Sequence, residues 1–254
     1  MPATPTPSDE NDPELIERIR ALVPDITAGQ IAQLMQLRGL LHDINQRINL
    51  TAVRDKTGIG RRLVLESLRL AGPLRESLDG VESPHVLDLG TGGGIPGLPL
   101  AIALPDARFT LLDATRKKLD AVQELIDHLE LSNTTVLHGR AEELAHLPEW
   151  RGRFSTITAR AVSSLPALLE LGLPLLRLHG IMLLPKGTGI DVELQQGALA
   201  GTMLGGVISG ASILPDIGSS IETTLVVVEK IRTTPLSYPR RSGIPARQPL
   251  GADS

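Results

Sequence analysis

Cysteine is absent from the 254-residue chain, and aromatic residues are almost absent, with two Phe, one Tyr and one Trp. Without cysteine there is no disulfide, no thiolate nucleophile and no cysteine-ligated metal. So few rings exclude a stacking platform for single-stranded nucleic acid, and the core must be aliphatic. No apolar run reaches the ~18 residues of a membrane span, and the first residues lack the apolar segment of a signal peptide. We therefore expect a cytoplasmic protein without a membrane partner.

The chain also carries little net charge, −4 at neutral pH. Hydrophobic residues make up 41% and charged residues 21%, which is typical of a globular protein and excludes a disordered or fibrous one. A nucleic-acid partner would therefore need a local basic patch. Two basic clusters are present, at residues 54–62 and at residues 230–250, where five basic residues stand without an acid. The six histidines show no spacing typical of metal ligands, so we expect no metal site.

By composition and periodicity the chain divides into a disordered tail at residues 1–12, a helical section at 13–80, an α/β domain at 81–232 and an extended basic tail at 233–254. Asp12 before Pro13 is a typical N-cap for the first helix. Thr27 and Gln30 form a capping box for the second. A third helix is predicted at residues 60–77.

Strand-like and helical runs alternate within the α/β domain. Strands are predicted at residues 85–89, 108–112, 134–138, 154–159, 181–184, 206–213 and 223–230. Helices are predicted at residues 98–104, 117–129 and 165–176, and the rhythm alters after residues 191–199. This alternation is typical of parallel βαβ units, and the last two strands, with no clear helix between them, favour an antiparallel edge pair. The expected fold class is α/β: a doubly wound, mostly parallel, Rossmann-like seven-stranded sheet.

Glycines cluster after the first predicted strand, in the run Asp88-Leu-Gly-Thr-Gly-Gly-Gly-Ile-Pro-Gly97. Such a turn lets a ligand approach the backbone, with amide N–H groups facing it. Gly92, Gly94 and Gly97 match the GxGxxG pattern of an NAD site. Asp88, with the glycines at 90, 92 and 94, matches the DxGxGxG pattern of methyltransferases that use S-adenosylmethionine, which we favour. A purely structural turn is the third alternative.

Polar residues follow the next two predicted strands. Asp113 ends the second strand, where a carboxylate accepts hydrogen bonds from both hydroxyls of a ribose. The alternative is a solvated cap for the following helix. The turn Gly139-Arg-Ala-Glu142 follows the third strand, beside the expected position of an adenine, although a glutamate opening a helix is commonplace on protein surfaces.

Several motifs, in order from about Leu34 to Leu250, together resemble one family, the bacterial small-subunit ribosomal RNA methyltransferase G family, also called the glucose-inhibited division protein B family. They are Asn49-Leu-Thr51, the run from Asp88 to Gly97, Leu111-Leu-Asp-Ala-Thr-Arg-Lys-Lys118, Gly139-Arg-Ala-Glu142, Thr158-Ala-Arg-Ala-Val162, Lys186-Gly187 and Tyr238-Pro-Arg-Arg-Ser-Gly-Ile-Pro245. The resemblance implies a methyltransferase domain at residues 81–232 and methylation of guanosine N7 in 16S ribosomal RNA, with S-adenosyl-L-methionine as cofactor.

The resemblance also implies site residues. The family's cofactor contacts fall on Gly90, Ile95, Ala141, Glu142 and Arg160, and the pattern adds Asp88, Thr91, Gly92, Gly94 and Asp113. Arg160 follows the fourth strand and is expected nearest the chemistry, on the guanine O6 or a flanking phosphate, unless it pairs with a neighbouring carboxylate. Lys186, Arg240 and Arg241 are expected to contact the RNA, which is either free 16S RNA or a small-subunit particle. We expect a monomer.

Two positions depart from the family's pattern. Ile44 stands where the family usually has an aromatic residue, and Leu63 stands where it usually has a histidine, which puts any role of that histidine in substrate contact in doubt. Two other functions remain as alternatives: an NAD-dependent oxidoreductase, and a ribosome-assembly protein that binds RNA without turnover.

Overall fold

The computed structural model describes residues 12–218 and 222–251. The predicted disordered tail lies outside this range except for Asp12, which caps the first helix by accepting a hydrogen bond from the Leu15 N–H at 3.1 Å. The first elements are α1 (Pro13–Leu22), α2 (Ala28–Arg47), α3 (Lys56–Gly58), the π-helix η1 (Ile59–Leu65), α4 (Glu66–Leu68) and α5 (Ala71–Leu78). The capping box of Thr27 and Gln30 is present at the start of α2, as predicted.

The third predicted helix is broken into η1, α4 and α5. Pro73 explains why one continuous helix does not form, because its nitrogen carries no hydrogen for the carbonyl one turn earlier. The chain restarts instead at α5, with Pro73 in the first turn, where that hydrogen is not needed.

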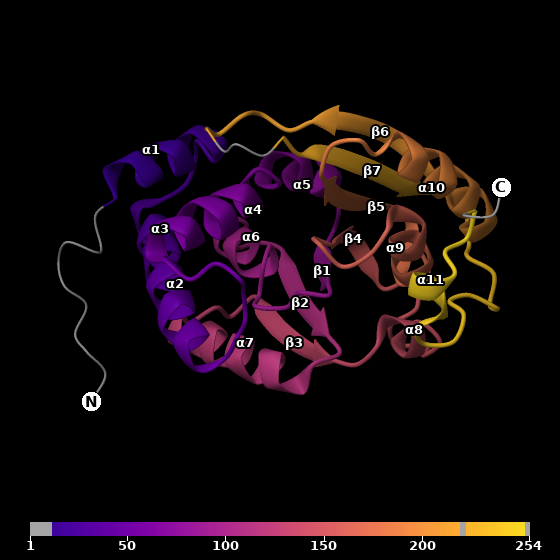
Figure 1. Cartoon of the computed structure of the whole chain (residues 1–254), viewed down its shortest axis with the longest axis horizontal. Coiled ribbons are helices and arrows are strands. Elements are labelled where there is room, and N and C mark those ends of the chain that lie inside the picture. The colour runs from indigo at the N-terminus through magenta and orange to yellow at the C-terminus, as the bar shows by residue number, and fades with distance from the viewer. Residues whose placement is uncertain (1–11, 219–221, 252–254) are drawn as a thin grey trace.

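The seven-stranded sheet has the order β3-β2-β1-β4-β5-β7-β6. Its strands are β1 (His85–Leu89), β2 (Arg108–Asp113), β3 (Thr134–His138), β4 (Phe154–Thr158), β5 (Leu176–Lys186), β6 (Gly206–Ile213) and β7 (Thr224–Lys230). The first five strands are parallel, and β7 pairs antiparallel with both β5 and β6. The predicted doubly wound sheet with an antiparallel edge pair is therefore confirmed (Figure 1).

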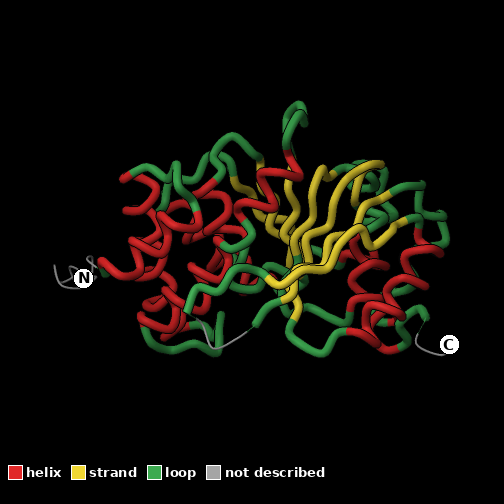
Figure 2. The backbone as a smooth tube through the Cα atoms, turned by 90° about the horizontal axis from the view of Figure 1, so that it is seen from above, coloured by secondary structure: helices red, strands yellow, loops and turns green. Residues whose placement is uncertain are grey.

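Helices cover both faces of the sheet (Figure 2). The remaining ones are α6 (Gly97–Ala103), α7 (Arg116–His128), α8 (Ala141–Leu144), α9 (Leu165–Gly172), α10 (Asp191–Leu204) and α11 (Ile244–Arg247). On one face, the apolar side chains of α1, α2 and α5 share a single buried cluster with those of α6 and α7. On the other face, α8, α9 and α10 form a second cluster. The N-terminal helices thus belong to the same core as the sheet.

The predicted helix at residues 165–176 is too long, and the following strand begins earlier than predicted. The helix ends at Gly172, and β5 already begins at Leu176. Pro174 accounts for the early end, because its nitrogen carries no hydrogen to donate to the carbonyl one turn earlier. The leucines of the helix and those of the strand that follows are both buried, so the hydrophobic periodicity does not show where the helix ends and the strand begins.

The C-terminal segment is not the extended tail that was predicted. The Arg151 guanidinium donates to the carbonyls of Thr234 and Tyr238, at 2.9 and 3.0 Å, and so holds a turn of this segment. Farther along, Arg240 bonds the buried carboxylate of Glu170 in α9, and the short helix α11 follows. Residues 233–251 therefore fold back onto α8 and α9, at the right of Figure 1.

Candidate active site

The carboxyl ends of β1, β2 and β4 meet at one edge of the sheet and frame a cleft of about 500 Å³, which we call the glycine cleft. One wall is the loop of residues 90–93, and Asp113 lies beside it. Residues 160–162, which follow β4, form the opposite wall. The N-terminal section contributes residues 50 and 51. An open α/β sheet binds its ligands at this position.

Two glycines give the loop its shape. Gly90 and Gly92 have φ angles of +73° and +56°, a region that other residues rarely adopt. A side chain at Gly90 would collide with Val162, whereas one at Gly92 would project into open space. We expected the N–H groups of the loop to face a ligand, but most of them already donate hydrogen bonds within the protein. The N–H groups of Gly90 and Thr91 donate to the Leu112 carbonyl, and that of Gly92 donates to Asp113.

Asp113 lies where the ribose acid was predicted, at the end of β2 and lining the cleft. One carboxylate oxygen accepts the Gly92 N–H at 2.9 Å, and the other accepts the Thr115 N–H at 2.8 Å. These bonds hold the carboxylate in place, and each oxygen keeps a further lone pair. The arrangement suits a ligand that presents two neighbouring hydroxyl groups.

Asp88, by contrast, is fully buried and does not line the cleft. Its carboxylate accepts hydrogen bonds from the Thr91 hydroxyl at 2.6 Å and from the Gly97 N–H at 3.0 Å. Burial raises the pKa of Asp88 to about 6, against the effect of these bonds. We interpret Asp88 as the group that ties the glycine loop to α6, and its predicted contact with a cofactor stays a prediction.

The structure brings part of the predicted cofactor set together. Gly90, Thr91, Gly92, Ile95, Asp113 and Arg160 line the glycine cleft. Gly94, Ala141 and Glu142 do not. Ala141 is buried, and the Glu142 carboxylate accepts the N–H of Gly243, at 2.9 Å, from the C-terminal segment. The predicted place of the adenine beside Ala141 and Glu142 is untested.

Sequence reasoning missed the way in which the N-terminal section closes the cleft. Asn45 of α2 is 1% exposed, and its side-chain oxygen accepts the N–H groups of Leu50 and Thr51, at 2.9 and 3.0 Å. Its side-chain amide donates to the Val53 carbonyl at 3.0 Å. Asn45 thereby shapes the loop that lies against Gly93. The sequence feature that could have indicated this role is the single asparagine of α2, which stands beside the apolar stripe of that helix.

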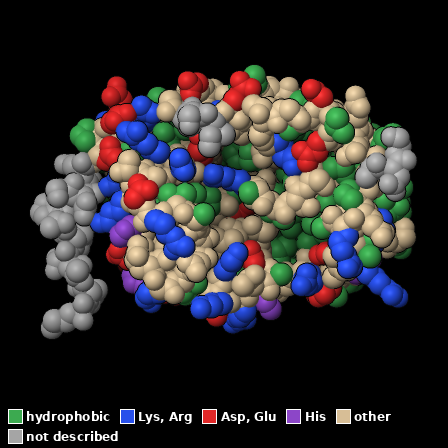
Figure 3. All heavy atoms as spheres, in the orientation of Figure 1, with side chains coloured by type: hydrophobic (Ala, Val, Ile, Leu, Met, Phe, Trp, Pro, Cys, Tyr) green, Lys and Arg blue, Asp and Glu red, His purple; other side chains and the backbone are tan. Residues whose placement is uncertain are grey.

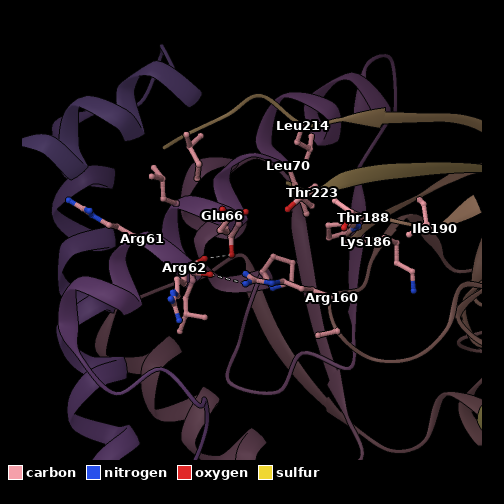
Figure 4. A pocket seen from close by; sticks show the side chains of 18 of the residues that line it. Arg61, Arg62, Glu66, Leu70, Arg160, Lys186, Thr188, Ile190, Leu214 and Thr223 are labelled. Atoms are coloured by element: carbon pink, nitrogen blue, oxygen red, sulfur yellow. Dashed lines mark hydrogen bonds between the residues drawn. The ribbon is translucent and has the colours of Figure 1, made fainter. Parts of the chain in front are cut away.

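A second cavity, of about 690 Å³, opens next to the glycine cleft; we call it the side cavity (Figure 4). Arg160, Ala161 and Leu63 line both spaces. One Arg160 nitrogen, Nη2, donates to the Arg62 carbonyl at 2.8 Å, and the other, Nη1, is buried without a partner. Burial lowers the pKa of Arg160, whereas the carboxylates of Glu66 and Asp88 raise it. Arg160 is thus held between the two spaces.

The predicted RNA-contacting residues lie in two places. Lys186 lines the side cavity, where its ammonium donates to the Ser163 carbonyl at 3.0 Å and pairs with Glu193 at 2.8 Å. Arg240 and Arg241 lie elsewhere, in the C-terminal segment beside α8, and line neither space. Their contact with RNA stays a prediction.

Within residues 12–218 and 222–251, no group of three His, Cys, Asp or Glu side chains is placed to hold a metal ion. Among the helices in the described ranges, none combines the length and apolar character needed to cross a membrane.

Strand order, the antiparallel last pair and a ligand cleft beside β1 define a Rossmann-like methyltransferase fold. Among solved structures, a Galdieria sulphuraria protein assigned as sarcosine dimethylglycine methyltransferase superposes with a TM-score of 0.52 at 13% identity, over 70% of this chain and 88% of that one, which shows the fold alone. The family model described as rRNA small subunit methyltransferase G matches residues 30–210. The chain belongs to this family.

Relatives named ribosomal RNA small subunit methyltransferase G agree with this assignment. The one from Deinococcus radiodurans is 45% identical over 221 residues, covering 86% of this chain and 85% of the relative. That from Deinococcus deserti is 41% identical over 244 residues, covering 94% and 98%. The predicted family is confirmed.

Proposed function

We propose that this protein transfers a methyl group from S-adenosyl-L-methionine to N7 of a guanosine in 16S ribosomal RNA. The observation that carries the proposal is the pair of adjoining spaces at the carboxyl ends of the strands, with Arg160 lining both. Such a pair lets a methyl donor in one space face a base in the other.

The glycine cleft fits the proposed cofactor. Gly92 leaves open space where a side chain would otherwise stand, which suits close approach of a ligand. The Asp113 carboxylate is held so that its remaining lone pairs can accept both ribose hydroxyls. When bound, S-adenosylmethionine supplies an electrophilic methyl group on a positively charged sulfur.

The proposed reaction needs no general base. Guanine N7 has a free lone pair and loses no proton when the new carbon–nitrogen bond forms and the carbon–sulfur bond breaks. The protein has therefore only to align N7 with the methyl carbon, and orientation alone contributes several kcal/mol. We assign to Arg160 the role of orienting the base; the bond of its guanidinium to the Arg62 carbonyl, at the border of both spaces, supports this role.

Basic side chains that can contact the phosphates of a ribosomal RNA substrate surround these two spaces. Arg61 and Arg62 are exposed at the rim of the side cavity, and Lys118 lines the glycine cleft. Figure 3 shows Lys and Arg side chains gathered over the half of this face that the N-terminal helices form. Such a patch binds phosphates even though the whole chain is slightly acidic. We propose that the protein acts as a monomer in the cytoplasm.

Thermal unfolding with added ligands tests the cofactor. S-adenosylmethionine or its demethylated product should raise the melting temperature, since a ligand at a hundredfold excess over its Kd stabilises by roughly 2.7 kcal/mol. NAD should leave the temperature unchanged. A larger shift with NAD would remove the basis of the proposal and favour the oxidoreductase alternative.

A further inference from the structure

Two buried polar atoms of the side cavity have no hydrogen-bond partner within the described residues. They are Oε1 of Glu66 and Nη1 of Arg160. Buried polar groups in proteins are nearly always paired, so an unpaired one requires an explanation. Both residues line the side cavity, so an acceptor and a donor without partners lie at its wall and point to a ligand that offers the opposite pair.

The other oxygen of Glu66 is accounted for by the fold. Oε2 pairs with the Arg69 guanidinium at 2.8 Å, and the side chains of Glu66 and Arg69 are 13% and 2% exposed. Arg69 is held in turn by the Leu214 carbonyl at 2.9 Å. This chain of contacts fixes the Glu66 carboxylate in α4 but leaves Oε1 without a partner.

Glu66 and Arg160 form no ion pair with each other in the part of the chain that the structure describes. Each is anchored separately, Glu66 by Arg69 and Arg160 by the Arg62 carbonyl, and Figure 4 shows both side chains at the cavity. The positions of the two residues relative to the glycine cleft also differ. Arg160 lines both the glycine cleft and the side cavity, whereas Glu66 lines the side cavity alone.

We propose that Glu66 and Arg160 together read the edge of the target guanine, with Glu66 as a specificity-determining residue for its N1–H and N2 amino groups. The inference rests on the proposed function. Along that edge of guanine stand N7, then O6, then N1–H and the N2 amino group. When Arg160 donates to O6, N7 faces the glycine cleft and the N1–H and N2 donors face Oε1 of Glu66. The order of groups on the base matches the order in the protein.

The same arrangement rejects adenine. Adenine carries an amino donor where guanine has O6, and it has an unprotonated N1 where guanine has N1–H. Arg160 would then meet a donor and Glu66 an acceptor, so both buried groups would stay unpaired. A site that leaves its own buried polar groups unpaired discriminates strongly.

The rest of the cavity suits an extruded base. Leu65, Leu70, Pro96, Pro185 and Leu214 supply apolar walls. The volume of about 690 Å³ lies within the roughly 300–1,000 Å³ of pockets that enclose small ligands. Enzymes that modify a base commonly turn it out of the stack into such a pocket.

Glu66→Gln is the test variant, because it changes one hydrogen-bond acceptor of the side chain into a donor and keeps the shape of the side chain. The glutamine oxygen can still accept the Arg69 N–H, and the NH₂ group then takes the place of Oε1 as a donor. The methylated guanosine is first mapped by mass spectrometry with the wild-type protein. RNA ligated to carry guanosine or inosine at that position then serves as substrate, since inosine lacks only the N2 amino group.

We expect wild-type kcat/KM to fall roughly ten- to hundredfold on inosine, the loss of one hydrogen bond to a charged acceptor. In Glu66→Gln, kcat/KM on guanosine falls similarly and the guanosine-to-inosine ratio approaches one. Glu193→Gln is the matched control. Its carboxylate lines the same cavity but is paired with Lys186 and with the Leu165 N–H, so the wild-type ratio should persist.

A wild-type ratio in Glu66→Gln overturns the inference and leaves the methyltransferase proposal standing. Equal wild-type rates on guanosine and inosine overturn it as well, even if the variant does not fold. Absence of methyl transfer by the wild-type protein to any guanosine would instead sink the proposed function and the inference with it.

Discussion

Replacing Arg240 with alanine should destabilise the protein, because it leaves a buried carboxylate without its cation. Glu170 is 0% exposed in the middle of the apolar helix α9. The Arg240 side chain contacts both of its oxygens, at 2.9 and 2.7 Å, and also donates to the Gln248 carbonyl at 2.7 Å. Only the backbone N–H of Arg240, at 2.8 Å from the carboxylate, would remain in the variant.

The expected loss is about 3 kcal/mol, the lower end of the ~3–5 kcal/mol for breaking a buried pair, since the backbone bond persists and Arg240 is partly exposed. For a chain of this size, each kcal/mol lowers the melting temperature by roughly 2–4 °C, so the shift should be about 6–12 °C. Thermal unfolding followed by circular dichroism measures it.

Arg241→Ala is the matched control. Arg241 is the next residue, is exposed, and makes no side-chain hydrogen bond to any described residue. Its replacement should leave the melting temperature within about 1 °C, since surface substitutions usually cost less than 0.5 kcal/mol. Adding Glu170→Gln to Arg240→Ala should recover part of the loss, because the buried charge is then absent. If Arg240→Ala unfolds at the wild-type temperature, the pair is not what holds the C-terminal segment.

Two further predictions concern the carboxylates at the glycine loop. Asp113→Ala should weaken binding of S-adenosylhomocysteine at least tenfold by calorimetry, because two hydrogen bonds of ~1.5–3 kcal/mol each are lost; unchanged affinity would contradict the assignment. Burial gives Asp88 a pKa of about 6 in the folded protein, above its ordinary value of 3.8, so the native state holds this proton more tightly. Its contribution to stability should therefore fall by up to about 3 kcal/mol as the pH rises from 4 to 6. Asp88→Asn should remove that slope in urea unfolding, and equal slopes in both proteins would refute it.

Local patterns were enough to predict the sheet. The bounds of β1, β3 and β6 agree with the prediction, because each strand is a short run followed by glycine, proline or another turn signal. The long leucine-rich stretch around Pro174 was misread, since burial on all sides removes the periodicity that separates helix from strand.

Contacts between distant residues could not be read from local patterns. The fold of the C-terminal segment depends on Arg240 and Glu170, which are 70 positions apart. A lone glutamate among the leucines of α9 was the only signal, since a buried acid requires a partner. The bond of Glu142 to Gly243 and the bond of Asp88 to Gly97 also join residues that no local pattern connects, so the sequence did not predict them either. Motifs predict which segments form a site, but not which side chains face the ligand.

Guanosine N7 methylation through Arg160 is tested by mass spectrometry of 16S ribosomal RNA from cells with and without this gene. We expect 7-methylguanosine at one position in wild-type cells and its loss in the deletion strain. Expression of the wild-type protein should restore the modification, and Arg160→Ala at equal abundance should not. An identical modification pattern with and without the gene would show that this protein does not methylate 16S ribosomal RNA.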